Sequence, residues 1–143
     1  FGRAQRVGSD LSCLFFDLDL FKQVNDTCGH AFGDYVLKTI GGLVKKNVRI
    51  GDLAARFGGE EFVVLLPNTG VEQALVVAEK IRSLVESFRF SDQGRHWPVT
   101  VSIGVASLNS DQPPSASSLL QLSDQALYLA KDGGRNRVER HTM

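Results

Sequence analysis

The chain has 143 residues, of which 43% are hydrophobic and 22% charged, a composition typical of one globular domain with a sizeable core. Its 16 Lys and Arg residues balance its 16 Asp and Glu residues, which argues against a general nucleic-acid or membrane-surface binder. No apolar run approaches the ~20 residues of a membrane span. Cys13 and Cys28 lack the spacing of a metal site or a disulfide framework, so we expect reduced thiols in a cytoplasmic protein.

Apolar periodicity predicts both strands and helices along the chain. Strands are expected at residues 11–16, in a hairpin with arms 53–57 and 62–66, at 99–105, and at an edge strand that opens near Val138. Helices are expected at 1–7, 20–26, 31–47, 71–88 and 119–131, with a break at 27–30 and connections at 67–70, 91–96 and 109–118. This order predicts an α/β domain of the α+β kind, in which helices pack on a mixed sheet.

The most informative string is Gly58-Gly59-Glu60-Glu61, between the two hairpin arms. Adjacent glycines indicate a tight turn, and the two carboxylates that follow repel each other without a local partner. A hard divalent cation such as Mg²⁺ would relieve that repulsion. A solvated hairpin tip is the alternative interpretation, and the string alone leaves it open.

Asp17 and Asp19 end the first predicted strand and point to one face, because alternate residues of a strand share a face. Like charges beside a buried strand are costly. If this strand neighbours the hairpin, Asp17 approaches Glu60, and the two acids form an oxygen-rich pocket suited to phosphate-bound Mg²⁺. The alternative is that both acids simply project into solvent beyond the sheet.

Two further polar sets lie in the segment that follows. Lys22 comes after Phe21 at a helix start, where free backbone N–H groups favour phosphate, although an ordinary surface lysine fits equally. Asn25, Asp26 and Asp34 together offer the donors and acceptors that read a guanine edge. Helix capping and turn formation also explain these three residues.

Two basic sets stand elsewhere in the chain. Lys131 and Arg135 close the last helix, where they can reach terminal phosphates or simply complement the helix dipole. Arg49 and Asp52 precede the hairpin, either as a turn with a surface ion pair or as the grip on a second ligand.

Together these motifs resemble the GGDEF family of diguanylate cyclases over most of the chain, from Leu14 to Arg137. The signature appears in its Glu variant, Gly58-Gly59-Glu60-Glu61-Phe62. Further matches, in the order and spacing of the family, are Phe16 to Asp26, Gly29 to Asp34, Val101 to Ala106 and Ala126 to Asn136. The family's opening Leu-Thr-Gly-Leu-like segment is missing before Phe1, and Leu20 and Cys28 depart mildly from the usual residue types.

The resemblance implies a palm-like, ferredoxin-like domain with a mixed, mainly antiparallel sheet, similar to class III nucleotidyl cyclases. It implies catalytic roles for Asp17, Glu60 and Glu61, and metal binding by these acids and the Leu18 carbonyl. It also implies three groups of substrate-binding residues: the Leu20 and Phe21 amides with Lys22, Lys131 and Arg135 for the phosphates, Asn25 and Asp34 for guanine, and Gly58 and Gly59 for close approach of the backbone. Arg49 and Asp52 match the family's product-inhibition site, with Lys80 or Arg82 as a basic partner.

The implied reaction condenses two GTP molecules into cyclic di-GMP and two pyrophosphates, with Mg²⁺ or Mn²⁺ as cofactor at about two ions per active site. Each domain would hold one GTP, so a homodimer is required, and cyclic di-GMP would act as a feedback inhibitor. We expect no nucleic-acid partner and no membrane contact by this domain. We also expect residues 1–143 to be a single GGDEF domain of a longer cytoplasmic protein, without its N-terminal segment and upstream sensory module. Whether an upstream domain anchors the full-length protein to a membrane is left open.

Two alternatives come from other functional classes. One is a non-catalytic sensor or scaffold that binds GTP or cyclic di-GMP, and the presence of both Glu60 and Glu61 argues against it. The other is a cyclase that makes a cyclic mononucleotide, against which the Asn25 and Asp34 set argues.

Overall fold

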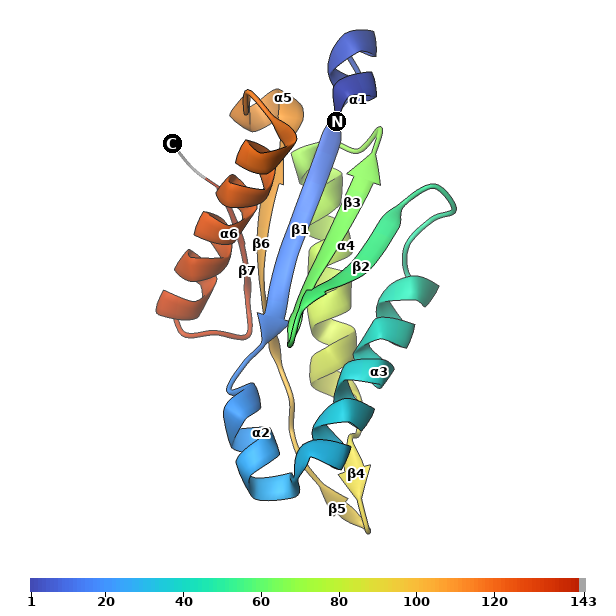
Figure 1. Ribbon diagram of the computed structural model, residues 1–143, viewed down its shortest axis with the longest axis vertical. Helices are drawn as coiled ribbons and strands as arrows, with labels where there is room; N and C mark the ends of the chain where they lie inside the picture. The colour runs from blue at the N-terminus through green and yellow to red at the C-terminus, as the bar shows by residue number, and fades with distance from the viewer. Residues whose placement is uncertain (142–143) are drawn as a thin grey trace.

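The computed structural model describes residues 1–141 and is built on a five-stranded sheet in the order β2-β3-β1-β6-β7 (Figure 1). The strands are β1 (Leu11–Leu18), β2 (Leu53–Gly58), β3 (Glu61–Pro67), β6 (Val101–Ser107) and β7 (Val138–Arg140). Neighbouring strands run antiparallel, except that β7 is parallel to β6. This confirms the expected mixed, mainly antiparallel α+β fold and the edge strand at Val138.

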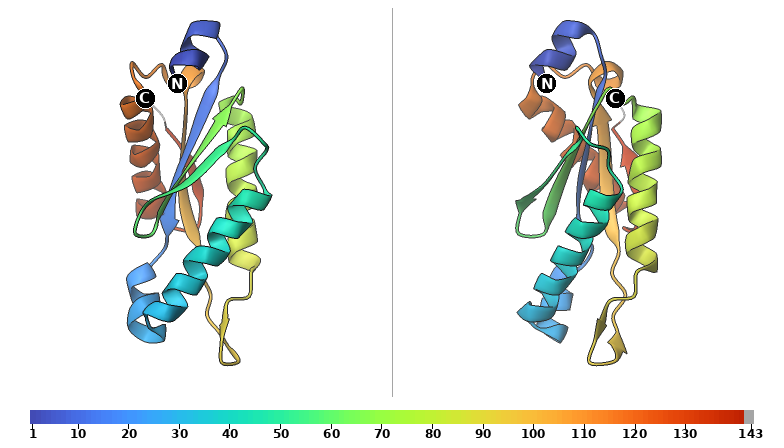
Figure 2. Two further views of the ribbon diagram at one scale, coloured as in Figure 1. Left: turned by 45° about the vertical axis from the view of Figure 1, so that its right-hand side comes forward. Right: turned by 90° about the vertical axis from the view of Figure 1, so that its right-hand side faces the viewer.

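Helices cover both faces of the sheet (Figure 2). They are α1 (Gly2–Val7), α2 (Phe21–Cys28), α3 (His30–Lys46), α4 (Val71–Ser87), α5 (Leu108–Asp111) and α6 (Ala116–Asp132). Helix α6 packs on one face, against β1 and β6, whereas α3 and α4 share a core with the opposite face. In Figure 1, α2 lies beyond the end of β1 and beside the first turns of α3. No helix within residues 1–141 combines the length and apolar character that crossing a membrane requires.

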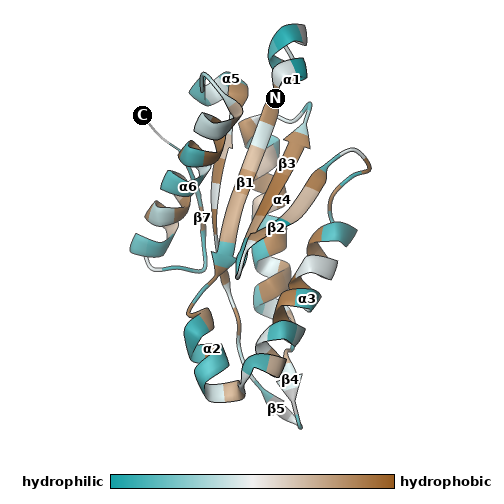
Figure 3. Cartoon of the chain, viewed as in Figure 1, coloured by the Kyte–Doolittle hydropathy of each residue, from teal (hydrophilic) through white to brown (hydrophobic). Residues whose placement is uncertain are grey.

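Strand β1 is buried on both faces, as the sequence predicted, and is apolar except at Ser12 and Asp17. Phe16 and Leu18 point into the core beneath α3 and α4, and Cys13 and Phe15 point into the core beneath α6. Each large apolar side chain buried in this way stabilises the fold by about 1.5–3 kcal/mol. The central strands are accordingly apolar along most of their length in Figure 3, and polar residues appear where β1 ends.

Gly104 in β6 sets how closely α6 approaches the sheet. A Cβ atom added there would lie 2.2 Å from both the Leu127 nitrogen and the Ser123 oxygen of the α6 backbone. Backbone atoms so close to the strand leave room for no side chain. This close approach fixes the last turn of α6, which carries Lys131, against the end of β1.

Three connections differ from the expected ones. Residues 91–96 form a hairpin of β4 (Ser91–Asp92) and β5 (Arg95–His96). The expected loop at 109–118 holds α5 and the start of α6, because the hydroxyls of Ser107 and Ser115 accept hydrogen bonds from the N–H groups three residues on and begin both helices. The expected break at 27–30 narrows to Gly29 alone, with φ +89°.

Candidate active site

The C-terminal end of β1 meets the tip of the β2–β3 hairpin. Asp17 lies directly opposite Glu61 of β3 on one side and opposite Ser102 of β6 on the other. Residues directly opposite each other on paired strands project from the same face, so the two carboxylates project together. The structure therefore confirms that the first strand neighbours the hairpin, as the approach of Asp17 to Glu60 requires.

The carboxylate of Asp17 is buried and only half satisfied. Its Oδ2 accepts a hydrogen bond from the Lys131 ammonium, whereas Oδ1 is buried with no hydrogen-bond partner within residues 1–141. Burial raises the pKa of Asp17, Lys131 pulls it down, and the charges of Glu60 and Asp19 raise it further. A buried acceptor without a partner is costly to the folded protein, which makes this oxygen a natural place for a cation.

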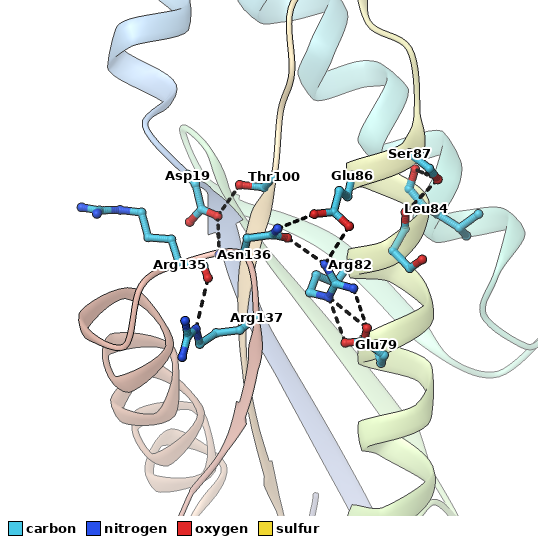
Figure 4. Close-up of polar contacts among 11 residues, drawn as sticks. Asp19, Glu79, Arg82, Leu84, Glu86, Ser87, Thr100, Arg135, Asn136 and Arg137 are labelled. Atoms are coloured by element: carbon cyan, nitrogen blue, oxygen red, sulfur yellow. Dashed lines mark hydrogen bonds and ion pairs between the residues drawn. The ribbon is translucent and has the colours of Figure 1, made fainter.

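Asp19 has a different role from Asp17. Its Oδ1 accepts from the Ser102 hydroxyl at 2.6 Å. Its Oδ2 accepts from the Thr100 hydroxyl at 2.7 Å and from the Asn136 backbone N–H at 2.9 Å (Figure 4). These donors come from β6, from Thr100 just before it and from the loop after α6. The alternative that both acids project into solvent is therefore wrong for Asp19, which ties parts of the fold together.

The hairpin turn lies one residue later in the chain than the Gly58-Gly59 turn that the sequence indicated. Gly58 pairs with Glu61, so the turn residues are Gly59 and Glu60, and a bulge between Arg56 and Gly58 shifts the register. The Arg56 Nε donates to the Gly59 carbonyl at 2.8 Å and braces the tip. A Cβ atom on Gly58 would lie 2.9 Å from the Glu61 Oε1, so a glycine at 58 leaves room for that carboxylate, whereas Gly59 faces open space.

The acids at this corner suit a metal that arrives with its own ligands. No group of three or more His, Cys, Asp or Glu side chains able to hold a metal is assembled within residues 1–141. Magnesium commonly binds through one or two carboxylates plus the phosphates of a substrate. The unpartnered Asp17 oxygen meets that requirement, and because the Leu18 side chain is buried in the core, its carbonyl is the ligand atom that Leu18 can offer.

The predicted guanine-binding residues Asn25 and Asp34 lie on α2 and α3, which pack against each other. A Cβ atom on Gly33 would lie 2.0 Å from the Asn25 Oδ1, so the Asn25 side chain rests on α3 directly beside Asp34. Asp34 itself is exposed. Side chains that offer both amide and carboxylate groups can recognise adjacent donors and acceptors on a base edge.

The predicted phosphate-binding residues lie at the start of α2 and at the end of α6. Leu20 precedes the first turn of α2 in the left-handed region, with φ +56°, and its side chain is 50% exposed. Phe21 is buried and Lys22 is exposed. The Gln23 N–H already donates to the Leu20 carbonyl at 3.0 Å, so the Phe21 and Lys22 N–H groups are the ones that the start of α2 offers to a ligand. Lys131 approaches from the end of α6 and already binds an oxygen of Asp17.

Arg49 and Asp52 form a separate site at the other end of β2. Asp52 accepts from the Arg49 backbone N–H at 2.7 Å, and the Arg49 guanidinium reaches the Thr69 hydroxyl at 2.6 Å and the Pro67 carbonyl at 3.1 Å. The Asp52 side chain is 4% exposed against 61% for Arg49, so the expectation of two exposed groups is wrong for Asp52.

A hollow of about 300 Å³ adjoins this ion pair. It is lined by residues around the pair and by one face of α4: Asn47, Val48, Leu66, Thr69, Gln73, Val76 and Val77. Lys80 follows on α4 one turn beyond Val76, so it remains the candidate basic partner from this helix. Arg82 is engaged elsewhere, with Glu79, Glu86 and Asn136, which corrects its assignment to this site.

The family model for the GGDEF domain of diguanylate cyclases matches residues 1–137. The chain belongs to the GGDEF family. Diguanylate cyclase A of Treponema denticola is 49% identical over 128 residues, which are 90% of this chain and 34% of the relative. The chain therefore spans about a third of the length of that curated GGDEF protein.

Solved GGDEF domains share the fold. The active GGEEF domain of a diguanylate cyclase from Vibrio cholerae has a TM-score of 0.92 and 38% identity, and the match covers 100% of this chain and 90% of that one. The GGDEF domain of DgcB from Caulobacter crescentus, in complex with c-di-GMP, has a TM-score of 0.92 and 32% identity, with 98% of this chain and 82% of that chain covered.

Sequence reasoning missed the residues that support this GGDEF site. Thr100 and Ser102 hold Asp19, and Asn136 links the loop after α6 to both Asp19 and α4. A visible signal was the string Gly134-Arg135-Asn136, because Gly and Asn tolerate left-handed backbone and mark a specialised turn.

Proposed function

We propose that this GGDEF domain is a diguanylate cyclase that condenses two GTP molecules into cyclic di-GMP and releases two pyrophosphates. The observation that carries the proposal is the buried Oδ1 of Asp17, which has no partner within residues 1–141 and lies beside the Gly59-Glu60 turn. A buried carboxylate oxygen that lacks a donor is costly unless a ligand completes it. The presence of Glu60 and Glu61 beside it favours catalysis over a sensor or scaffold that only binds nucleotides.

The substrate would lie across the corner between β1, α2 and α6. Asn25 and Asp34 would bind the guanine edge, and the Leu20 and Phe21 amides with Lys22 would bind phosphate oxygens at the start of α2. Lys131 and Arg135 would bind the terminal phosphates. Lys131 is well placed for this, because its ammonium already pairs with a carboxylate oxygen and a phosphate can take over that partnership.

GGDEF cyclases depend on metal ions, and we assign Mg²⁺ or Mn²⁺, about two ions per active site, to the Asp17, Glu60 and Glu61 carboxylates and the Leu18 carbonyl. When bound, these ions would acidify the attacking 3′-hydroxyl and would neutralise charge that builds up on the phosphate. Glu60 is one of two candidates for the base in this step, and the other is the metal-bound hydroxyl itself.

The reaction needs two copies of the domain. The 3′-hydroxyl of each GTP attacks the α-phosphate of the other, so a single domain holds a substrate without a nucleophile. The working unit is therefore a homodimer in which two active sites face each other. Residues 1–143 would serve as the catalytic domain of a longer cytoplasmic protein, whose upstream sensory module brings the two copies together.

The separate Arg49 and Asp52 site would bind cyclic di-GMP and inhibit synthesis. Asp52 holds the Arg49 backbone, so the exposed guanidinium starts from a fixed position. A guanidinium can clamp a guanine edge or a phosphate with two parallel hydrogen bonds. The hollow beside it offers space for a planar base.

The test incubates the full-length protein with GTP and Mg²⁺ and separates the products by chromatography. Cyclic di-GMP formation that Glu60→Gln abolishes, while Glu72→Gln at the exposed start of α4 retains it, supports the proposal. Cyclic GMP as the product, or tight dinucleotide binding without turnover, overturns it.

A second variant tests the inhibitory site by itself. Arg49→Ala should keep synthesis and relieve inhibition, so that added cyclic di-GMP no longer slows the initial rate. Glu60→Gln should abolish synthesis but retain binding of cyclic di-GMP, which calorimetry measures. Inhibition of Arg49→Ala at wild-type concentrations of cyclic di-GMP would show that the inhibitor binds elsewhere.

A further inference from the structure

A chain of polar contacts joins α4 to the loop that follows α6, far from it in sequence. The Arg82 Nη1 donates to the Asn136 Oδ1 at 2.8 Å, and the Asn136 Nδ2 donates to a carboxylate oxygen of Glu86 (Figure 4). We call Arg82, Glu86 and Asn136 the α4–loop bridge. Both polar atoms of the Asn136 amide are engaged in it, so the bridge fixes the orientation of this side chain.

Arg82 is held from the α4 side as well. Its Nε and Nη2 donate to Glu79, and its Nη1 also lies 3.3 Å from Glu86. The Arg82 side chain is 15% exposed, although Glu79 and Glu86 are 55% and 48% exposed. The hydrogen bond from Arg82 lowers the pKa of Glu79, and hydrogen bonds from Asn136 and then Arg82 lower the pKa of Glu86. Contacts within α4 therefore fix the orientation of the Arg82 guanidinium independently of its contact with the loop.

The loop at the other end of the bridge has an unusual backbone. Arg135 and Asn136 are consecutive residues in the left-handed region, with φ +65° and +47°. Asn adopts this region more readily than most residues, but Arg does not. A strained pair of this kind persists only where the surroundings hold it in place.

Three contacts hold that backbone. The Asn136 N–H donates to Asp19, the Arg135 N–H donates to the Ala130 carbonyl at 3.0 Å, and the Arg137 Nε donates to the Arg135 carbonyl at 3.2 Å. The Arg135 side chain, in contrast, points away from the bridge in Figure 4. Its backbone is fixed while its guanidinium stays available for a ligand.

We propose that Arg82 and Asn136 are positioning residues for the triphosphate of the substrate, an inference that rests on the proposed function. The α4–loop bridge holds the left-handed turn that aims Arg135 at the terminal phosphates. Arg82 itself touches no substrate. Its contribution is to remove the freedom of a loop that would otherwise have to be ordered when the nucleotide binds.

This role predicts a selective defect. A loosened loop weakens contacts to the terminal phosphates, but leaves the guanine site between α2 and α3 untouched. Affinity for GTP should therefore fall, whereas affinity for GMP, which lacks the terminal phosphates, should not. A merely structural role would lower affinity for both nucleotides or for neither.

The experiment compares GTP and GMP binding by calorimetry, with Mg²⁺ present, in full-length wild-type protein and in two variants. GTP is represented by an analogue with a methylene group in place of the oxygen between the α- and β-phosphates, because the proposed cyclase would consume GTP itself. Asn136→Gly removes the side-chain link and keeps a residue suited to left-handed backbone, and Arg82→Leu removes the other partner. We expect about fivefold to tenfold weaker GTP binding in both variants and unchanged GMP binding. Glu72→Gln removes another exposed ion pair of α4, with Arg140, and should change neither affinity.

Two results would overturn the inference. One is a wild-type affinity of Asn136→Gly for GTP, and the other is an equal loss of GTP and GMP affinity in that variant. Asn136→Gly decides the question even where Arg82→Leu unfolds. A double variant with both Arg82→Leu and Asn136→Gly adds a further check. Because both changes would break the same link, its GTP affinity should match that of the single variant that binds GTP more weakly. Failure of the proposed function looks different, since the wild-type protein would then form no cyclic di-GMP from GTP and Mg²⁺.

Discussion

Two carboxylates at the end of β1 lie two positions apart and have opposite surroundings. Asp19 and Asp17 are almost equally buried, at 8% and 5% exposure, so burial does not separate them. Asp19 accepts three hydrogen bonds, from β6, from Thr100 just before it and from the loop after α6. Asp17 accepts one, from Lys131, and keeps an oxygen without a partner within the described chain.

The difference shows how one strand end serves both structure and ligand binding. A buried acid whose oxygens are all satisfied stabilises the fold, because each donor would lose a partner without it. A buried acid left half satisfied weakens the fold and gains most when a cation arrives. The number of completed hydrogen bonds, rather than burial or sequence, assigns Asp19 to the structure and Asp17 to the proposed active site.

The largest expected effect comes from removing the charge of Asp17. Asp17→Asn keeps the shape and a hydrogen-bond acceptor for Lys131, but removes the charge that would attract a metal ion. We expect cyclic di-GMP synthesis at saturating GTP and Mg²⁺ to fall by about a thousandfold or more. Initial rates by chromatography measure the effect, and Asp124→Asn, at an exposed position of α6, serves as the control.

Retention of activity in Asp17→Asn within tenfold of wild type would break the comparison, because the unpartnered oxygen would then have no ligand to hold. Asp19→Asn tests the same comparison at the other acid. An amide there turns one acceptor oxygen into a donor that faces other donors, so its defect should appear first as reduced stability.

The second effect is on stability and belongs to Asp19. Asp19→Ala leaves the Ser102 hydroxyl, the Thr100 hydroxyl and the Asn136 N–H without their acceptor. We expect the free energy of unfolding to fall by about 2–4 kcal/mol, since buried donors are costly when unpaired. Urea unfolding measures it, and Asp124→Ala should change it by less than about 0.5 kcal/mol. Equal losses in Asp19→Ala and Asp17→Ala would contradict the division of roles.

Much of the fold could be predicted because its signals are local. The apolar run of β1 and the periodicity of α4 gave their extents to within about two residues. The hairpin of β4 and β5 and the start of α6 at Ala116 were missed. Polar residues there make helix caps and short strand pairs, which composition alone does not distinguish from a loop.

The candidate site was predictable in its residue types but not in their partners. The pattern placed Asp17 and Asp19 on one face, and the structure agrees, yet no local rule shows that Thr100 and Asn136 complete one acid and not the other. Arg82 shows the same limit. Its spacing from Glu79 and Glu86 predicts pairs within α4, whereas its contact with Asn136 spans 54 residues and depends on the fold.

The smallest expected effect is a pH dependence of stability that reports on Asp17 without any substrate. Burial raises the pKa of Asp17 above its value in the unfolded chain, against the opposing pull of Lys131. The folded state therefore binds the proton more tightly. The resulting stabilisation is complete below the unfolded pKa of about 3.9 and is lost as the pH rises through the folded pKa. In the absence of divalent ions, Asp17→Asn should be more stable than wild type at pH 7, and the gain should shrink towards pH 4. Urea unfolding of both proteins at the two pH values measures it. A variant less stable than wild type at pH 7 would mean that the Lys131 ion pair outweighs burial, and Asp17 would then resemble Asp19 as a stabilising acid.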